Sequence, residues 1–154
     1  MSSFSPTKAT PNNTPPQVAL AILEQKGGFL MQLRDDLPTI LYPGHWGLFG
    51  GHLEEGETPE EGLKRELMEE INYIPPNPTL FRVQEEPTII RYFYYASLTV
   101  PLEALNLQEG MDLALVSVES IQQGQCYSAK IDQVRPLGLV HRSILLDFFK
   151  SQVK

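Results

Sequence analysis

The sequence predicts an α/β fold, an α/β/α sandwich in which a mixed β-sheet lies between helices. Two observations predict it. Short runs rich in apolar, β-branched and aromatic residues, typical of strands, alternate with two segments whose apolar residues recur every three or four positions, as on one face of a helix. These elements follow one another as hairpin, helix, strands, helix, and that order favours a sheet covered by helices.

The first half of the chain predicts a β-hairpin and a short strand. An apolar strand covers residues 18–23, a Lys-Gly-Gly turn covers residues 26–28, and a second strand covers residues 29–33. After an irregular connection that contains two prolines, the apolar stretch "WGLF" at 46–49 predicts a short strand. This strand leads into the glycine pair at 50–51.

The second half predicts further strands and a final helix. The stretch "IIRYFYYASLTV", residues 89–100, is the strongest strand signal because it is dense in β-branched and aromatic side chains. Another strand is predicted at residues 111–118, "MDLALVSV". The last helix is expected from about Pro136 to Phe149, where spacings of three and four separate the apolar residues Leu137, Val140, Ile144, Leu145 and Phe148.

Length and composition indicate one globular domain. The chain has 154 residues, of which 42% are hydrophobic and 20% charged, ordinary values for a domain with a single core. Residues 1–16 are rich in Pro, Ser, Thr and Asn and almost free of large apolar side chains, so we expect a flexible N-terminal leader. Residues 17–154 are then the folded domain.

Charge and cysteine content argue against several classes of protein. The net charge of −7 disfavours binding to a nucleic-acid polymer, which requires clustered Lys and Arg to neutralise phosphates. The single cysteine, Cys126, cannot form a disulfide within the chain and fits a reducing cytoplasm. No apolar run approaches the ~18 residues of a membrane span, and the first residues lack the apolar stretch of a signal peptide. We expect a cytoplasmic monomer or homodimer with no membrane partner.

The stretch 58–72 carries the signals of a well-bounded helix. Thr58 is a good N-cap, Pro59 suits the first helical position, and Glu61 completes a capping box with Thr58. Asn72 tolerates the left-handed conformation that closes a helix. Spacings of three and four predict a buried stripe, Leu63, Leu67 and Ile71, and an adjoining acidic strip, Glu66, Glu69 and Glu70.

Two explanations compete for the acidic strip. The ordinary one is a solvated face held by ion pairs four residues apart, Glu60 with Lys64 and Glu61 with Arg65. Those pairs use both cations of the stretch, so the strip would be left with carboxylates that repel one another by about 4 kcal/mol at about 4 Å and an effective dielectric near 20. A bound cation would relieve this repulsion, and ligands that are all oxygen select Mg²⁺ or Mn²⁺.

Residues 51–73 resemble the Nudix box, G-x5-E-x7-R-E-U-x-E-E-x-G-U, in which U is an apolar residue. The match covers 23 residues and departs at two of them, Asn72 where the family usually has glycine and Tyr73 where it has an aliphatic residue. The first departure keeps the capping chemistry and the second keeps bulk. The residues that match are Gly51, Glu57, Arg65, Glu66, Leu67, Glu69 and Glu70.

The resemblance implies a Nudix-type sandwich and hydrolysis of a nucleoside diphosphate linked to another moiety. It implies a Mg²⁺ cofactor, with Mn²⁺ possible, and it implies that Glu57 orients Arg65. The ligands that it implies are Glu66, Glu69, Glu70 and the backbone carbonyl of Gly50. The chemistry agrees, because the oxygens of a P–O–P linkage repel a nucleophile unless cations neutralise them.

A further carboxylate, acting as metal ligand or general base, often comes from a loop beyond the box in this family. Glu109 precedes the predicted strand 111–118 in the way that the corresponding glutamate does in MutT-like members. Glu85 and Glu86, which we expect in another loop, compete for the same role.

The sequence says less about the substrate. Trp46 is the residue we expect to stack on a base, Arg34 at the end of the second strand is a candidate phosphate ligand, and Gly50 and Gly51 let backbone approach a diphosphate closely. The first expectation is an ordinary or oxidised nucleoside triphosphate, cleaved to the monophosphate and pyrophosphate. The alternative is ADP-ribose or a nucleotide sugar.

Two other functions stay open. A ligand-sensing Nudix module without turnover is one, although the chain keeps the full set of charged residues in the box. An enzyme similar to isopentenyl diphosphate isomerase is the other, and it would need a reactive cysteine. Cys126 lies far along the chain from the box and is more simply a packed or surface thiol.

Overall fold

The structure is a computed structural model that describes residues 14–38 and 42–152. The leader expected at residues 1–16 lies outside the described residues except for Thr14, Pro15 and Pro16. The elements are β2 (Gln17–Gln25), β3 (Gly28–Leu33), β4 (Trp46–Gly47), β5 (Phe49–His52), α1 (Pro59–Ile71), β6 (Thr79–Glu86), β7 (Ile89–Ser97), a 3-10 turn (Leu102–Ala104), β8 (Asp112–Val116), α2 (Val118–Gln123), β9 (Gln125–Ser128), β10 (Gln133–Pro136) and α3 (Leu139–Gln152).

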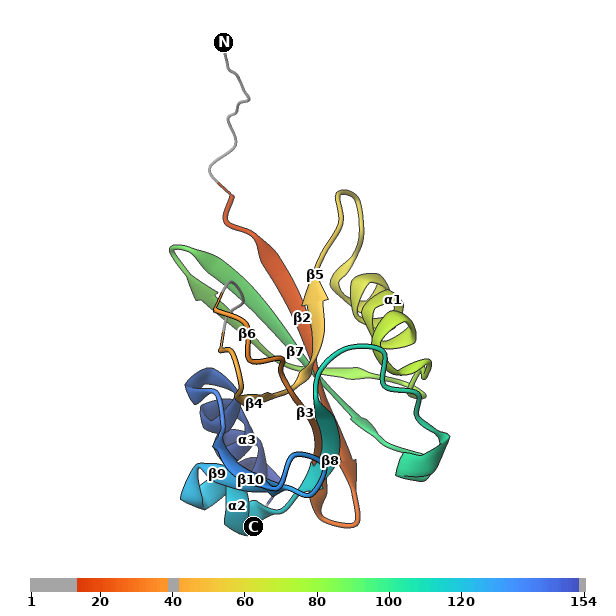
Figure 1. Ribbon diagram of the computed structural model, residues 1–154. Coiled ribbons are helices and arrows are strands. Elements are labelled where there is room, and N and C mark those ends of the chain that lie inside the picture. Colours follow the sequence, from red (N-terminus) through yellow and green to blue (C-terminus); the bar gives the residue numbers. More distant parts are fainter. Residues whose placement is uncertain (1–13, 39–41, 153–154) are drawn as a thin grey trace.

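The main sheet has seven strands and is mixed (Figure 1). Its path runs β4-β3-β2-β7-β6, with β5 paired to β2 and β8 paired to β3. Strand β2 is parallel to β7, whereas β2 is antiparallel to β3 and β5. Strands β9 and β10 form a separate two-stranded sheet. β2 therefore pairs with three strands: its hairpin partner β3, the glycine-containing strand β5 and the long strand β7.

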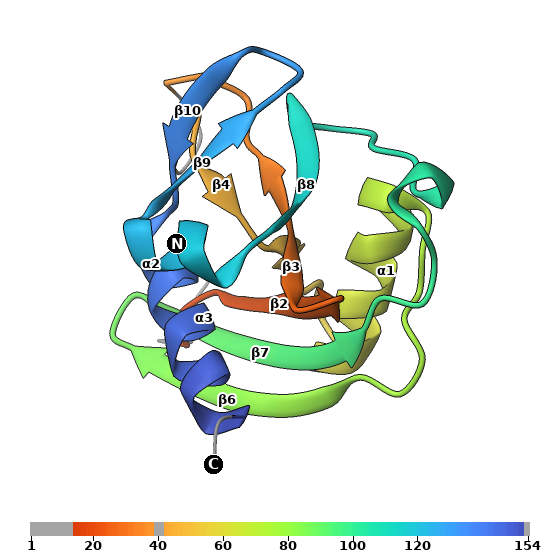
Figure 2. The same cartoon turned by 90° about the horizontal axis from the view of Figure 1, so that it is seen from below.

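Helices cover both faces of this sheet (Figure 2). Because side chains alternate along a strand, residues 18, 20 and 22 of β2 pack in the same core cluster as α3, whereas residues 19, 21 and 23 pack in the cluster that contains α1. The two clusters are the two layers of the core. The predicted α/β/α sandwich with a mixed sheet is thus confirmed.

Helix α1 begins and ends as its sequence predicts. The Thr58 hydroxyl accepts from the Glu61 N–H at 3.1 Å, and the Glu61 carboxylate accepts from the Thr58 N–H at 2.9 Å, which is a complete capping box. Asn72 closes the helix at φ 55° and ψ 44°, in the left-handed region. The stripe of Leu63, Leu67 and Ile71 is fully buried. Capping and burial therefore hold α1 rigidly against the sheet.

Several elements differ from the predictions. The last helix begins at Leu139 instead of about Pro136, because Pro136 still pairs with Gln125 in β10. Strands β6, β9 and β10 were not predicted, since most of their side chains are exposed and the apolar alternation of a half-buried strand is missing. Glu85 and Glu86 were expected in a loop, but they lie at the end of β6. No helix in the described ranges is both long and apolar enough to cross a membrane.

Candidate active site

A cavity of about 250 Å³, the main cavity of the site, opens between the glycine pair of β5, the end of α1 and the start of α3. Two carboxylates, Glu70 and Glu109, and two guanidinium groups, Arg34 and Arg91, line it. The remaining wall is largely apolar and includes Val18, Leu20, Leu48, Ile89 and Val140. A second cavity of about 200 Å³ shares Arg34, Glu70 and Glu109 with the first. Charged groups and an apolar surface thus meet in one hollow, as ligand sites require.

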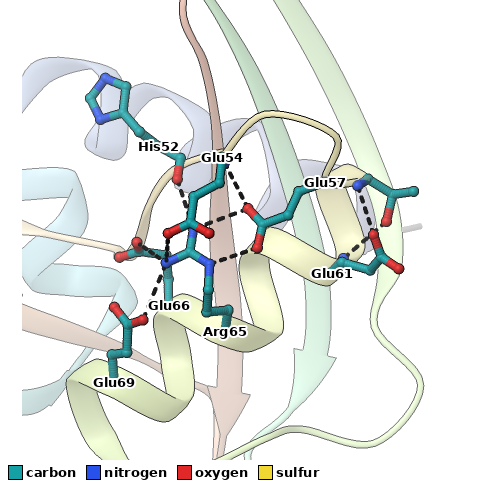
Figure 3. Close-up of polar contacts among 8 residues, drawn as sticks. His52, Glu54, Glu57, Glu61, Arg65, Glu66 and Glu69 are labelled. Atoms are coloured by element: carbon teal, nitrogen blue, oxygen red, sulfur yellow. Dashed lines mark hydrogen bonds and ion pairs between the residues drawn. The ribbon is translucent and has the colours of Figure 1, made fainter.

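Arg65 is the centre of a network of carboxylates on α1 and the loop before it (Figure 3). Its Nε lies 2.6 Å from one Glu57 oxygen and its Nη2 lies 3.1 Å from the other, a bidentate pair. Its Nη1 donates to Glu66 at 2.9 Å and to Glu69 at 3.3 Å, and Nη2 also donates to the carbonyl of His52. Arg65 therefore ties β5, the loop and α1 together.

This network sets the charge of its members. The hydrogen bond from Arg65, followed by the backbone N–H of Glu54, holds the pKa of Glu57 below its usual range. The carboxylates in turn raise the pKa of Arg65 further above its usual value. Both groups stay ionised across the physiological range, so the network is a fixed array of charges.

The structure corrects the ion pairs expected on α1. Glu60 and Lys64 do pair, at 3.0 Å. Glu61 does not pair with Arg65, because its carboxylate is held in the capping box. Arg65 instead contacts Glu66 and Glu69, so the expectation that the whole acidic strip lacks a cation was wrong for these two residues.

Glu70 differs from the rest of the acidic strip. It accepts a hydrogen bond from the Gly50 N–H at 3.0 Å. Among the described residues, no Lys, Arg or His side chain forms an ion pair with it. Burial, followed by the negative charges of Glu66 and Glu109, raises the pKa of Glu70 to about 8, although the Gly50 N–H opposes this shift. A half-buried carboxylate crowded by anions is a position where a cation would be stabilised.

The glycine pair allows this crowding. Gly50 has φ +141°, and a Cβ there would collide with the carbonyl oxygen of Ala19 on the neighbouring strand. A Cβ on Gly51 would collide with the Glu66 carboxylate. Any larger residue would push β5 away from β2 or displace Glu66. Glycine at both positions therefore brings backbone directly against the carboxylates of α1.

The donor set fits a hard divalent cation. The carboxylates of Glu66, Glu70 and Glu109 and the carbonyl of Gly50 offer only oxygen ligands, which suit Mg²⁺ or Mn²⁺. Glu69, also an expected ligand, is 59% exposed and lies 3.3 Å from Arg65. Among residues 14–38 and 42–152, no three acidic, histidine or cysteine side chains converge closely enough to hold an ion as they stand. Glu66 accepts from Arg65 and also interacts with Glu70, so Arg65 helps to hold it beside Glu70.

The other predicted site residues divide into three groups. Arg34 lines both cavities, and its Nε is buried without a hydrogen-bond partner in the described residues. Glu109 lies beside Glu70, whose pKa it raises. Glu85 is exposed, and Glu86 forms an ion pair with Arg91 at 2.6 Å. Of the three competing glutamates, Glu109 is the one that the fold brings to Glu70.

Trp46 does not fulfil its predicted role. Its side chain is fully buried in β4, and its indole N–H donates to the carbonyl of Cys126 at 3.0 Å. Neither face of the ring is open to a base, so the stacking prediction was wrong. A tryptophan next to a glycine pair is compatible both with stacking on a base and with burial in the core, and the sequence alone could not distinguish these two roles.

His141 is a cavity residue that the sequence reasoning missed. It lies on α3, lines the main cavity, and its Nδ1 accepts from the Leu48 N–H at 3.0 Å. Burial, followed by the charges of Arg34 and Arg91, lowers the pKa of His141 to about 4. One signal was present, since His141 precedes the buried Ile144 and Leu145 by three and four positions and so lies on the inward stripe of the helix.

A family model for the NUDIX domain matches residues 13–136, most of the chain. The chain belongs to the Nudix family. The predicted resemblance is thereby confirmed, and the glutamates and glycines described above lie within the matched region.

Curated Nudix relatives match over part of the chain. An 8-oxo-dGTP diphosphatase of Haemophilus influenzae is 38% identical over 87 residues, which are 51% of this chain and 60% of that protein. The nucleoside triphosphatase NudI of Enterobacter sp. (strain 638) is 38% identical over 55 residues, 35% of this chain and 38% of that protein. The chain thus matches less than two thirds of the length of either relative.

Solved Nudix structures share the fold over nearly the whole chain. The NUDIX domain of Shewanella oneidensis NrtR, complexed with ADP ribose, aligns with a TM-score of 0.70 and 18% identity and covers 95% of both chains. The MutT protein of Methanosarcina mazei Go1 aligns with a TM-score of 0.68 and 20% identity, covering 94% of this chain and all of that one.

Proposed function

We propose that this Nudix protein hydrolyses the diphosphate linkage of a small nucleotide with the help of Mg²⁺, or of Mn²⁺ in its place. The observation that carries the proposal is Glu70, a half-buried carboxylate beside two other carboxylates and against a glycine pair, with no cation beside it among the described residues. The first substrate we propose is a nucleoside triphosphate, ordinary or oxidised, because both curated relatives act on such nucleotides.

Different residues of the site would carry out different parts of the hydrolysis. Water attacks one phosphorus, the bridging P–O bond breaks, and the leaving phosphate takes the bonding electrons while the proton of the water passes to a carboxylate. A divalent cation at Glu66 and Glu70 would neutralise the phosphate oxygens and lower the pKa of water. We assign the proton to Glu109, which is exposed and lies beside Glu70. Arg34 is placed to donate to a phosphate oxygen.

Metal removal is the first test. Protein treated with EDTA should lose hydrolysis of every nucleotide in a panel of triphosphates, ADP-ribose and nucleotide sugars, and added Mg²⁺ should restore it, with products separated by chromatography. Mg²⁺ should also raise the melting temperature, since a ligand that binds only the folded state stabilises it. Full-rate hydrolysis in the presence of EDTA would exclude a cation from the mechanism.

Glu109 provides the second test. Replacing Glu109 by glutamine removes the proton acceptor and should lower kcat by about 100-fold, a typical contribution of general base catalysis. Glu85→Gln is the matched control, because Glu85 is also an exposed glutamate but lies at the end of β6 and lines neither cavity. Equal rates for the two variants would remove Glu109 from the site.

ADP-ribose is the second substrate that we propose to test. The structural relative from Shewanella oneidensis was solved with this molecule. ADP-ribose also contains a diphosphate linked to a nucleoside, so the same charged residues would act on it. Tight binding of ADP-ribose without product formation would instead favour a ligand-sensing module.

The isomerase alternative has little support at Cys126. This cysteine does not line the main cavity, and burial raises the pKa of its thiol. A raised pKa leaves less of the reactive thiolate at neutral pH.

A further inference from the structure

Two hydrogen-bond donors on residues that line the main cavity have no acceptor in the described residues. Leu48 N–H donates to Nδ1 of His141, so Nδ1 carries no proton and the neutral ring carries its proton on Nε2. Among the described residues this Nε2–H has no hydrogen bond, and neither does the buried Nε of Arg34. The Arg34 Nε is buried and therefore costly without an acceptor, whereas the Nε2–H of His141 is accessible to water or to a ligand.

The surroundings keep the histidine neutral and fixed in orientation. Arg34 and Arg91 both line the cavity, and their charges oppose protonation of His141. The ring lies against Gly47, where a Cβ would meet it at 3.4 Å, and edge-on to Tyr42 with centroids 5.8 Å apart. The Leu48 N–H therefore fixes the tautomer of the ring, and the contacts with Gly47 and Tyr42 help to hold its orientation.

His141 lines the cavity together with an apolar surface. Val18, Leu20, Leu48, Ile89 and Val140 line the same hollow. A planar, mostly apolar group with an acceptor on its edge would satisfy both features, and among the parts of a nucleotide only the base has that chemistry. Phosphates, in contrast, belong beside Arg34 and the metal-binding carboxylates.

We propose that His141 is a specificity-determining residue that donates from Nε2–H to a carbonyl oxygen of the bound base. The cavity then favours bases with an oxo group at that edge over bases with an amino group, whose N–H would face the histidine N–H. The inference rests on the proposed function for the identity of the ligand as a nucleotide.

The test uses two matched pairs of triphosphates, ITP against ATP and UTP against CTP, in which an oxo group replaces an amino group. Wild-type protein should prefer at least one oxo member by about 10-fold or more in Kd and in kcat/KM, because the amino member leaves the histidine donor unpaired. Calorimetry with Mg²⁺ replaced by Ca²⁺ gives Kd, and chromatography of the products with Mg²⁺ gives kcat/KM.

Two variants assign the preference to the imidazole. In His141→Asn the shorter amide can accept from Leu48 but does not reach the Nε2 position, so the oxo preference should fall to about 1. His141→Gln places an amide N–H near the Nε2 position and should keep part of the preference. His45→Asn is the control, because His45 is a loop histidine bonded to the Pro43 carbonyl and does not line the cavity; its preference should equal that of the wild type.

The outcomes separate this inference from the proposed function. If no nucleotide is hydrolysed, the proposed function fails, but the Kd values of the two pairs still decide the role of His141. Equal Kd and kcat/KM for oxo and amino members in wild-type protein would overturn the inference without any variant. A preference that survives unchanged in His141→Asn would overturn it as well.

Discussion

Replacing Glu70 by glutamine is expected to lower turnover by about 100-fold or more while leaving the metal-free protein at least as stable as the wild type. A 100-fold loss corresponds to about 2.7 kcal/mol of transition-state stabilisation. The rate should fall because a neutral amide cannot neutralise a cation between Glu66 and Glu109. Folding should not suffer, because the amide oxygen of the introduced glutamine can still accept from the Gly50 N–H that Glu70 now binds.

The pH dependence of stability gives the same variant a second signature. The pKa of Glu70 is about 8 in the folded metal-free protein, against an ordinary value of 4.5. Between these two pH values the folded state binds more protons than the unfolded state, so stability should fall as pH rises from about 4.5 to 8. The loss attributable to Glu70 is on the order of 2–5 kcal/mol. Glutamine does not titrate, so the variant should lack this decline.

Urea titrations at several pH values, with and without Mg²⁺, measure both effects. Mg²⁺ should stabilise the wild type at pH 8 and should stabilise Glu70→Gln far less. Glu60→Gln is the control, because Glu60 forms only an exposed pair with Lys64 and should change neither rate nor stability by a measurable amount. If the two variants behave alike in turnover and in urea, the acidic strip is merely a solvated face.

The local signals of the sequence predicted helix α1 and the glycine pair well, because capping, spacing and backbone freedom act over a few residues. Thr58, Glu61 and Asn72 act as predicted for this reason. The resemblance to the Nudix box named Glu57 as the partner of Arg65, but helix spacing alone could not, since Glu57 is eight residues away and is brought near by the loop before the helix. A rule for residues four apart on a helix cannot find such a pair.

Long-range packing decided the remaining residues of the site. Trp46 and His141 are far apart in the sequence. Only the fold shows that Trp46 is buried and that His141 lines the cavity. Strand β6 was missed because its side chains are mostly exposed, so pairing with β7 and not an apolar pattern maintains it. Sequence periodicity reports which residues are buried, and it is silent where backbone pairing alone holds an element in place.

Replacing Arg65 by glutamine is expected to destabilise the fold by about 1–3 kcal/mol. Arg65 is the cation that Glu57, Glu66 and Glu69 share, and the side chains of Glu57 and Glu66 are only 16% and 18% exposed. Without the guanidinium these two carboxylates would be partly buried, close together and unpaired. Turnover should fall at least 10-fold, because Glu66 would no longer be held near Glu70.

Arg65→Lys distinguishes charge from geometry in this network. A lysine keeps the positive charge but cannot donate to both oxygens of Glu57 and to Glu66 at once. Its stability and turnover should therefore lie between those of the wild type and Arg65→Gln. Lys64→Gln, the neighbouring cation in an exposed pair with Glu60, is the control and should cost less than about 1 kcal/mol.

Acid should reduce the difference between Arg65→Gln and the wild type. The pKa of Glu57 is depressed in the folded protein by its hydrogen bonds to Arg65. The stability that this ion pair contributes is present above the unfolded value of 4.5 and is lost as pH falls through the folded pKa. Urea unfolding of both proteins at pH 7 and at pH 3 should show a large difference at the higher pH and a smaller one at the lower. An equal difference at both pH values would mean that Arg65 stabilises the fold by packing of its side chain and not by its charge.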